Sequence, residues 1–233
     1  MNRSLVYDWP TRIFHWLFVL FFVTAFLIAK LNDDDSPTFI FHMLAGMSIG
    51  FLVILRLVWG FIGSKHAQFM NWPLKIAQLK DYFVKMKSGE GEFFAGHNPA
   101  SSWAGLGMMA AAIGCVVTGL LMAFKIKKHL WEEVHEVAVY SLLALAGAHI
   151  LGVIMHTVRK KDLIGLSMLD GRKNHVQESE VIDSAKPLAG VVFLVLMIGW
   201  VAYLRSNLDG GTIKLFGQTI QLSKESDSES KDD

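Results

Sequence analysis

Five unbroken apolar runs are the feature of this 233-residue chain that most constrains its fold. Each is close to the ~20 residues with which a helix crosses the hydrocarbon core of a bilayer. Since 52% of the residues are hydrophobic and only 18% are charged, an ordinary soluble domain is disfavoured. We predict an all-α integral membrane protein, a four-helix transmembrane bundle with a fifth, C-terminal transmembrane helix. The predicted spans are residues 11–28, 39–63, 103–124, 134–158 and 188–205.

The lysines and arginines predict the orientation of the spans. They gather in the N-terminal segment, in the loop between the second and third runs, and in the stretch after the fourth run. Basic loops of membrane proteins stay in the cytoplasm. On the other side, Lys30 precedes an aspartate run, and two glutamates follow Lys125, Lys127 and Lys128. We expect a multi-pass protein of the bacterial inner membrane with a cytoplasmic N-terminus and a periplasmic C-terminus.

The same patterns predict the domain organisation. Residues 1–173 are expected to form the membrane domain, 174–187 a cytoplasmic connector, and 188–205 the fifth helix. The acidic, polar residues 206–233 are expected to be a disordered periplasmic tail. Between the second and third spans, residues 72–87 place apolar side chains at helical intervals among lysines, which predicts a helix lying on the membrane surface.

Cysteine and charge usage exclude several classes of protein. Cys115 is the only cysteine, so a disulfide within the chain, a C-x-x-C-H attachment of haem and an iron–sulfur cluster built from its own thiolates are excluded. We find no basic patch with interleaved aromatic residues, and we expect no nucleic-acid partner.

Histidines in or beside the spans are the candidate functional residues. Polar residues at such depths usually have a role, and the plain alternative for each one is a hydrogen bond to a neighbouring helix. His135 and His149 are 14 residues apart, which is about 21 Å along a helix and returns to within about 40° of the same face. The five histidines are His15, His42, His135, His149 and His156.

The expected orientation of the spans places four of these histidines in two pairs at two depths. His42 and His135 lie near the outer surface, and His15 and His149 lie near the inner surface. Two facing imidazoles at each depth match the axial ligands of two non-covalent haems b. A zinc site would need three or four ligands at one depth, and a proton relay would usually include carboxylates within the spans.

The remaining histidines receive other assignments. His156 competes with His149 as the inner ligand, but it lies about 31 Å from His135, at the inner boundary. It is expected to be an interfacial side chain near a haem propionate or a quinone head group. His66, His97, His129 and His175 lie in loops, where an exposed side chain is expected.

Two arginines are candidate partners of a haem propionate. Arg56 follows His42 by 14 residues, which places it at the level of the inner histidine pair, and Arg12 is a second cation at that level. The alternative for Arg56 is a side chain that extends to the inner surface. Gly46, Gly50, Gly147 and Gly152 lie near ligand positions, and they provide either room for a porphyrin or close helix packing.

Five segments resemble the prokaryotic di-haem cytochrome b561 family, which includes hydrogenase-type cytochromes b. They are VYDWPTRIFHW, FHMLAGMSIGFLVILRLVWGFIGSKHAQF, GHNPASSW, VHEVAVYSLLALAGAHILGV and DLIGLSMLDGRK, in this order over residues 5–173. The resemblance implies a four-helix core in which His15, His42, His135 and His149 bind two haems b. It also implies electron exchange between quinone and a periplasmic partner. The fifth span and the tail lie outside the family pattern, and GHNPASSW has serine where similar sequences often have glycine.

Three functions remain open at this point. The first is an electron-transfer protein that links the quinone pool to a periplasmic cytochrome c or redox enzyme. The second is a superoxide:quinone oxidoreductase whose outer haem reacts with superoxide drawn by Lys125, Lys127 and Lys128. The third is a membrane anchor subunit of a larger redox complex. Membrane lipid and quinone are expected partners in each case, and self-association is left open.

Overall fold

A computed structural model describes residues 3–33, 36–88, 93–209, 211–215 and 217–222. Its five longest helices are all long and apolar enough to cross a membrane. The prediction of an all-α, multi-pass membrane protein is confirmed. Helices α2 and α4 end just before the predicted limits of their apolar runs, and the other three extend beyond theirs. The five helices are α1 (Trp9–Leu31), α2 (Phe39–Ile62), α4 (Pro99–Ala123), α5 (Lys128–Lys160) and α7 (Pro187–Ser206).

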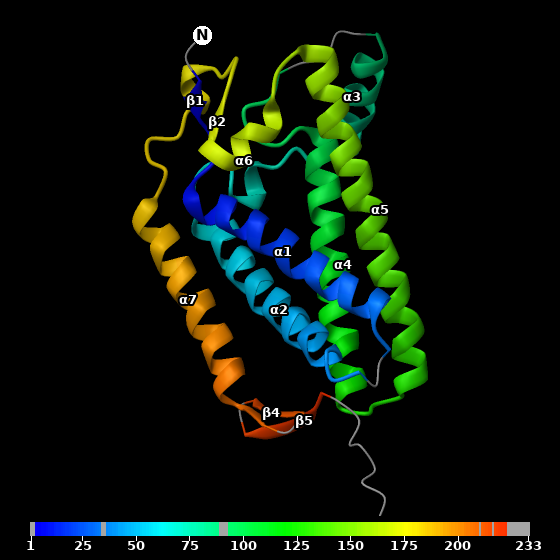
Figure 1. Ribbon diagram of the computed structural model, residues 1–233. Helices are drawn as coiled ribbons and strands as arrows, with labels where there is room; N and C mark the ends of the chain where they lie inside the picture. Colours follow the sequence, from blue (N-terminus) through cyan, green and yellow to red (C-terminus); the bar gives the residue numbers. More distant parts are fainter. Residues whose placement is uncertain (1–2, 34–35, 89–92, 210, 216, 223–233) are drawn as a thin grey trace, which may run out of the picture.

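The five helices are arranged as two hairpins and one appended helix. Helix α1 packs along α2, and α4 packs along α5, while the hairpins contact each other chiefly through α2 and α4. Helix α7 packs on α1 and α2, on the side away from α4 and α5 (Figure 1). We call the end of the bundle that carries the N-terminus the loop end, and the end that carries β4 and β5 the sheet end (Figure 1).

Two of the helices begin at capped residues that the sequence marks clearly. The backbone N–H of Thr11 donates to Asp8 Oδ1 (2.9 Å), and the N–H of Ser101 donates to Asn98 Oδ1 (2.8 Å). A proline occupies the first turn in both helices, where its missing N–H removes no helical hydrogen bond. These caps fix where α1 and α4 start, and hence the depth of the side chains that follow.

The loop end is built from short elements. Strand β1 (Ser4–Leu5) pairs with β2 (Arg172–Lys173), which joins the two ends of the 1–173 segment. The predicted surface helix is present as α3, but it begins four residues later because Trp72 instead packs into the bundle core. The other elements are η1 (Phe69–Asn71), α3 (Ile76–Ser88), η2 (Ile164–Leu166), α6 (Ser167–Asp170) and η3 (Glu178–Glu180).

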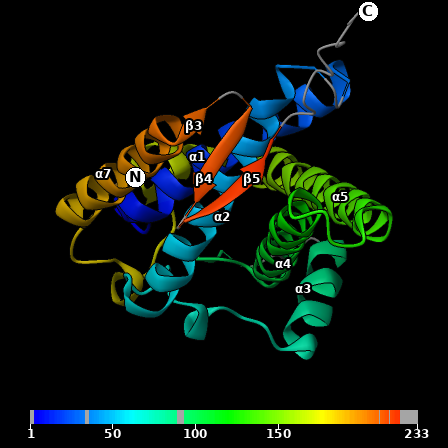
Figure 2. The ribbon, with the colours of Figure 1, turned by 90° about the horizontal axis from the view of Figure 1, so that it is seen from below.

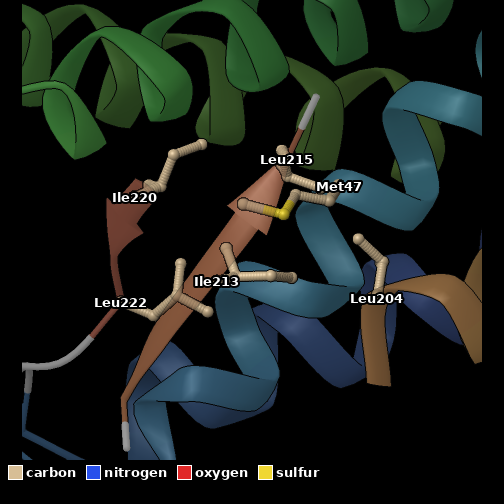
Figure 3. Packing of buried hydrophobic residues seen from close by; sticks show 6 residues of the cluster. All are labelled: Met47, Leu204, Ile213, Leu215, Ile220 and Leu222. Atoms are coloured by element: carbon tan, nitrogen blue, oxygen red, sulfur yellow. The ribbon is translucent and has the colours of Figure 1, made fainter. Parts of the chain in front are cut away.

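The sheet end differs from the disorder expected for residues 206–233. Strands β3 (Leu208–Asp209), β4 (Thr212–Leu215) and β5 (Gln218–Gln221) form an antiparallel sheet. Its strands lie across the end of the bundle (Figure 2), and its alternating apolar residues pack on Met47 and Leu204 (Figure 3). The exposed residues of β4 and β5 are polar. The acidic composition of the tail hid this period-two pattern. The part of the disorder prediction that concerns residues 223–233 lies outside the described residues. The buried residues that this C-terminal segment contributes to the cluster are Ile213, Leu215, Ile220 and Leu222.

Candidate functional site

His42 and His135 face each other near the sheet end, one from α2 and one from α5. Their ring centroids are 6.3 Å apart, with an angle of 66° between the planes. Two imidazoles that bind one metal ion from opposite sides each place a nitrogen about 2 Å from it, so their ring centres are about 6 Å apart. The observed spacing therefore fits a metal centre between the two rings.

Hydrogen bonds fix the protonation pattern of this pair. His42 Nδ1 lies 2.9 Å from the Ala25 carbonyl oxygen, which can only accept. His135 Nδ1 lies 2.9 Å from Thr118 Oγ1, and this hydroxyl donates its single proton to the Gly114 carbonyl (2.7 Å). This arrangement favours the tautomer with the proton on Nδ1 in both rings. Each Nε2 keeps its lone pair for a metal, which is the usual arrangement of ligating histidines.

His15 and His149 form the second pair, towards the loop end. The indole of Trp16, next to His15, donates to the Met168 carbonyl of α6 (2.9 Å), which places this part of α1 at the loop end. His15 and His149 are close enough to interact electrostatically. Unlike the first pair, His15 Nδ1 is buried without a hydrogen-bond partner among the described residues.

Arg56 is buried at the same end of the bundle. Its side chain is 3% exposed, and one guanidinium nitrogen donates to the Ala67 carbonyl (3.0 Å). The guanidinium carbon lies 4.7 Å from the ring centroid of Phe69 and 5.8 Å from that of Phe14, the residue before His15. The other terminal nitrogen, Nη1, has no partner in the described part of the chain. Arg56 therefore stays inside the bundle and does not extend to the surface.

Arg12 lies on the first turns of α1, at the loop end. It is also buried, and its guanidinium carbon lies 4.3 Å from the centroid of the Trp9 ring. Its Nε atom finds no partner within the described residues. The two arginines expected near the inner histidine pair thus both lie at the loop end, each with a polar atom left for a further group.

His97 belongs to the same region, and the expectation of an exposed side chain was wrong. Its ring lies 4.5 Å from the Trp72 ring centroid, and His97 Nδ1 and Trp72 Nε1 are both buried without partners among the described residues. Burial lowers the pKa of His97 to about 3, with smaller contributions from the nearby charges of Lys173 and Arg56. Its position in GHNPASSW, just before the cap of α4, was the available signal.

His66 is a second loop histidine that is buried, contrary to expectation. It is 6% exposed, and its Nε2 lies 2.7 Å from the Glu180 carbonyl oxygen. Burial lowers its pKa, although the hydrogen bond to Glu180 acts in the opposite direction. Gly96 packs directly on the ring, because a Cβ there would lie 2.5 Å from His66 Nδ1. His129 and His175 are exposed, as predicted.

His156 lies near the end of α5 and outside both pairs. Its ring is 6.4 Å from that of Phe93, and Asp162 and Lys160 are close enough to interact with it electrostatically. Its Nε2 is buried without a partner in the described part of the chain. The structure thus places His156 among loop-end residues, at the boundary position that the sequence indicates.

The residues at both depths fit haem b. Each pair offers two neutral imidazoles, and no group of three or more histidine, cysteine or acidic residues in the described ranges can hold a metal ion, which disfavours a zinc centre. Gly46 and Gly147, near His42 and His149, border open space, as the packing of a flat ring beside a helix requires. Gly50 instead serves helix packing, because a Cβ there would meet Val116 of α4 at 2.9 Å.

Comparison with known proteins gives the same family. Residues 6–171 match the family described as prokaryotic cytochrome b561. The chain is 22% identical to a protein of Escherichia coli (strain K12) described as "Probable Ni/Fe-hydrogenase 1 B-type cytochrome subunit", over 73% of this chain and 90% of that protein. It is also 22% identical to the "Probable Ni/Fe-hydrogenase B-type cytochrome subunit" of Bradyrhizobium diazoefficiens, over 72% and 85%. No solved structure matches.

The family match spans both helical hairpins and ends before α7. It includes all four paired histidines, and haem b is the cofactor of b-type cytochromes. The five apolar helices place the protein in a membrane. The chain is a membrane b-type cytochrome of electron transfer, and it belongs to the prokaryotic cytochrome b561 family.

Proposed function

We propose that this cytochrome carries electrons across the bacterial inner membrane between a quinone and a periplasmic redox partner, through two haems b. His42 and His135 are the axial ligands at the sheet end, and His15 and His149 are those at the loop end. The observation that carries the proposal is the 6.3 Å separation of the His42 and His135 rings, with both Nδ1 atoms engaged in hydrogen bonds.

The residues of the chain have distinct parts in this function. Bound haem b supplies a one-electron iron couple at each depth. The ligand histidines define two haem sites at different depths. Because His135 and His149 lie on one helix, the two sites are about 21 Å apart along it. Arg56 and Arg12 provide positive charge for propionates at the loop end. The apolar side chains between the pairs exclude water.

The loop end is proposed to be cytoplasmic and the sheet end periplasmic. The basic segments 64–88 and 159–186 lie at the loop end, in agreement with the distribution of charge in inner-membrane proteins. Quinone, which lies in the bilayer, would have direct access to the haems. A periplasmic cytochrome c or redox enzyme would meet the polar face of the sheet, and the hydrogenase subunits among the relatives favour a redox enzyme.

Spectroscopy of the purified protein tests the proposal. Reduced-minus-oxidised spectra should show a b-type α-band, with two haems per chain by pyridine haemochrome assay. In a stopped-flow instrument under anaerobic conditions, a quinol should reduce the oxidised haems, or a quinone should oxidise the haems of pre-reduced protein. A chain that carries one haem or none, or that exchanges no electrons with quinone, contradicts it.

A second candidate function is superoxide:quinone oxidoreduction. Lys125, Lys127 and Lys128 are exposed on the α4–α5 turn, at the same end as the His42–His135 pair. Their charge would draw a small anion to this end. Rapid haem reduction by superoxide without a protein partner, slowed when the three lysines are changed to glutamine, supports this function. Reduction that is slow, or insensitive to the lysines, rejects it.

A third candidate is an anchor subunit that holds a larger redox enzyme at the membrane. The relatives are described as hydrogenase subunits, and α7 with its sheet extends beyond the family match. A form truncated after residue 186 should then lose its partner on co-purification while it keeps its haem. Retention of the partner by this form assigns docking to the four-helix core.

A further inference from the structure

The two histidine pairs differ in what their Nδ1 atoms touch. At the sheet end, both His42 and His135 have an acceptor oxygen at 2.9 Å. At the loop end, His15 Nδ1 has no acceptor within the described residues, and the buried guanidinium of Arg56 lies beside the adjoining Phe14. Histidines of the same expected role therefore differ in the partners of their Nδ1 atoms.

This difference has a defined effect on iron. A hydrogen bond from Nδ1–H to an acceptor increases the electron donation of the imidazole, which stabilises the oxidised metal and lowers the reduction potential. A buried cation favours the reduced, less positive iron and raises the potential. At the sheet end the two acceptors act directly on the histidines, whereas at the loop end the charge of Arg56 is opposed by the buried carboxylate of Asp8.

We infer that the sheet-end site has the lower potential of the two and that Thr118 is the positioning residue that lowers it. This inference rests on the proposed function. Haem b held by His42 and His135 at one depth and by His15 and His149 at the other would supply a one-electron Fe(III)/Fe(II) couple at each site, so that a transfer between the sites would oxidise one iron and reduce the other. One electron moves, and no proton or bond is exchanged.

Thr118 is the residue of this set that mutation can change. It is 3% exposed on α4, and its hydroxyl proton is given to the Gly114 carbonyl, so its oxygen stays oriented as an acceptor for His135. The acceptor of His42 is a backbone carbonyl, which no substitution removes. Thr118 therefore adjusts the sheet-end site without being a ligand.

The test compares Thr118→Val, Thr118→Ser and wild type by spectroelectrochemical titration of the haem α-band. Thr118→Val keeps the shape and removes the hydroxyl acceptor, which leaves only the Cys115 backbone to interact with His135, so the lower midpoint should rise. A change on the order of tenfold in the electron-sharing equilibrium between the sites, equivalent to about 59 mV for one electron, is expected. Thr118→Ser retains the hydroxyl and should restore the wild-type midpoint.

Ser48 supplies a matched control. It is equally buried, and its hydroxyl donates to the Leu44 carbonyl of its own helix (2.8 Å) and forms no hydrogen bond to a histidine among the described residues. Ser48→Ala should leave both midpoints unchanged. If Thr118→Val loses haem altogether, the resonance Raman iron–histidine and spin-state markers of Thr118→Ser, together with its midpoints, still report on the hydroxyl.

His42→Ala assigns the two midpoints, because it removes the sheet-end ligand. Loss of the lower-potential component supports the inference, and loss of the higher-potential component overturns it. Unchanged midpoints in Thr118→Val, or a shift confined to the higher one, also overturn it. A wild-type protein with a single haem would contradict the proposed function itself, which separates the two failures.

Discussion

The sheet-end and loop-end histidine pairs occupy similar helices but are held by different means. His42 and His135 are each oriented by one hydrogen bond from a neighbouring helix. At the loop end, His15 Nδ1 has no such partner among the described residues, and the same end carries the buried side chains of Arg56 and Asp8. The contrast indicates that ligand orientation is set locally at one end and by the surrounding shell at the other.

The largest effect on this comparison is expected when one proposed ligand is removed from each pair in turn. His135→Ala and His149→Ala should each lower the haem content from two to about one per chain, because each removes a single axial ligand set. Haem per protein and the two midpoints are the measurements. His129→Ala, an exposed histidine at the start of α5, is the control and should keep both haems. Loss of all haem in either variant means that the two sites do not load independently.

The scaffold of the loop end is expected to depend on Asp8, which is fully buried. Its carboxylate accepts from Thr11 N, from Trp59 Nε1 (3.0 Å) and from Ser64 N (3.4 Å). Asp8→Ala removes the cap and leaves buried donors unpaired, which should cost about 3 kcal/mol or more and lower the melting temperature by roughly 10 °C. Asn98→Ala, which removes the cap of α4, should cost about 1 kcal/mol. Equal losses in the two variants would show that Asp8 acts only as a cap.

A smaller effect is expected where α7 meets α1 near the loop-end pair. A Cβ on Gly190 would lie 2.6 Å from Trp9 Cβ, so Gly190→Leu should push α7 away and cost about 1–3 kcal/mol. Gly199→Leu, on the same helix with nothing within 4 Å, is the matched control. Thermal melts should separate the two variants, while both keep two haems. Haem loss from Gly190→Leu alone would make α7 a part of the loop-end site.

The smallest expected effect is a pH dependence at His66. Because burial lowers its folded-state pKa, the unfolded chain binds a proton more readily as the pH falls below the unfolded value of about 6.5. Its contribution to stability is therefore complete above that pH and is lost towards the lower folded pKa. Melting temperatures between pH 8 and 5 should fall less in His66→Gln than in wild type, by no more than about 2–4 °C. Identical profiles would assign the acid sensitivity to other groups.

The sequence predicted the long-range features better than the local ones. Apolar runs and the 14-residue spacing on one helix follow from bilayer thickness and helix pitch, so the five helices and the facing of His42 with His135 could be anticipated. The burial of His66 and His97 could not, because it depends on how loops fold over Trp72 and Glu180. Thr118 was missed because a threonine in an apolar helix usually bonds only its own backbone.

The C-terminal sheet shows the same limit. Its apolar residues alternate within a stretch whose overall composition is acidic and polar, and their burial needs the surface that Met47 and Leu204 provide. No local propensity in so short a segment would make it fold alone. A tertiary surface that cannot be recognised in the sequence therefore decides the structure of strands β3, β4 and β5.

The arrangement of the hairpins has a consequence for assembly. Each proposed axial pair joins a helix of the α1–α2 hairpin to α5, whereas the protein's own packing joins the hairpins chiefly through α2 and α4. Cofactor loading would thus act as a cross-link between the two hairpins. Ligand linkage adds about 4 kcal/mol to stability when free ligand is a thousandfold above its dissociation constant. The haem supply of the cell would then set how much of this chain escapes membrane proteolysis.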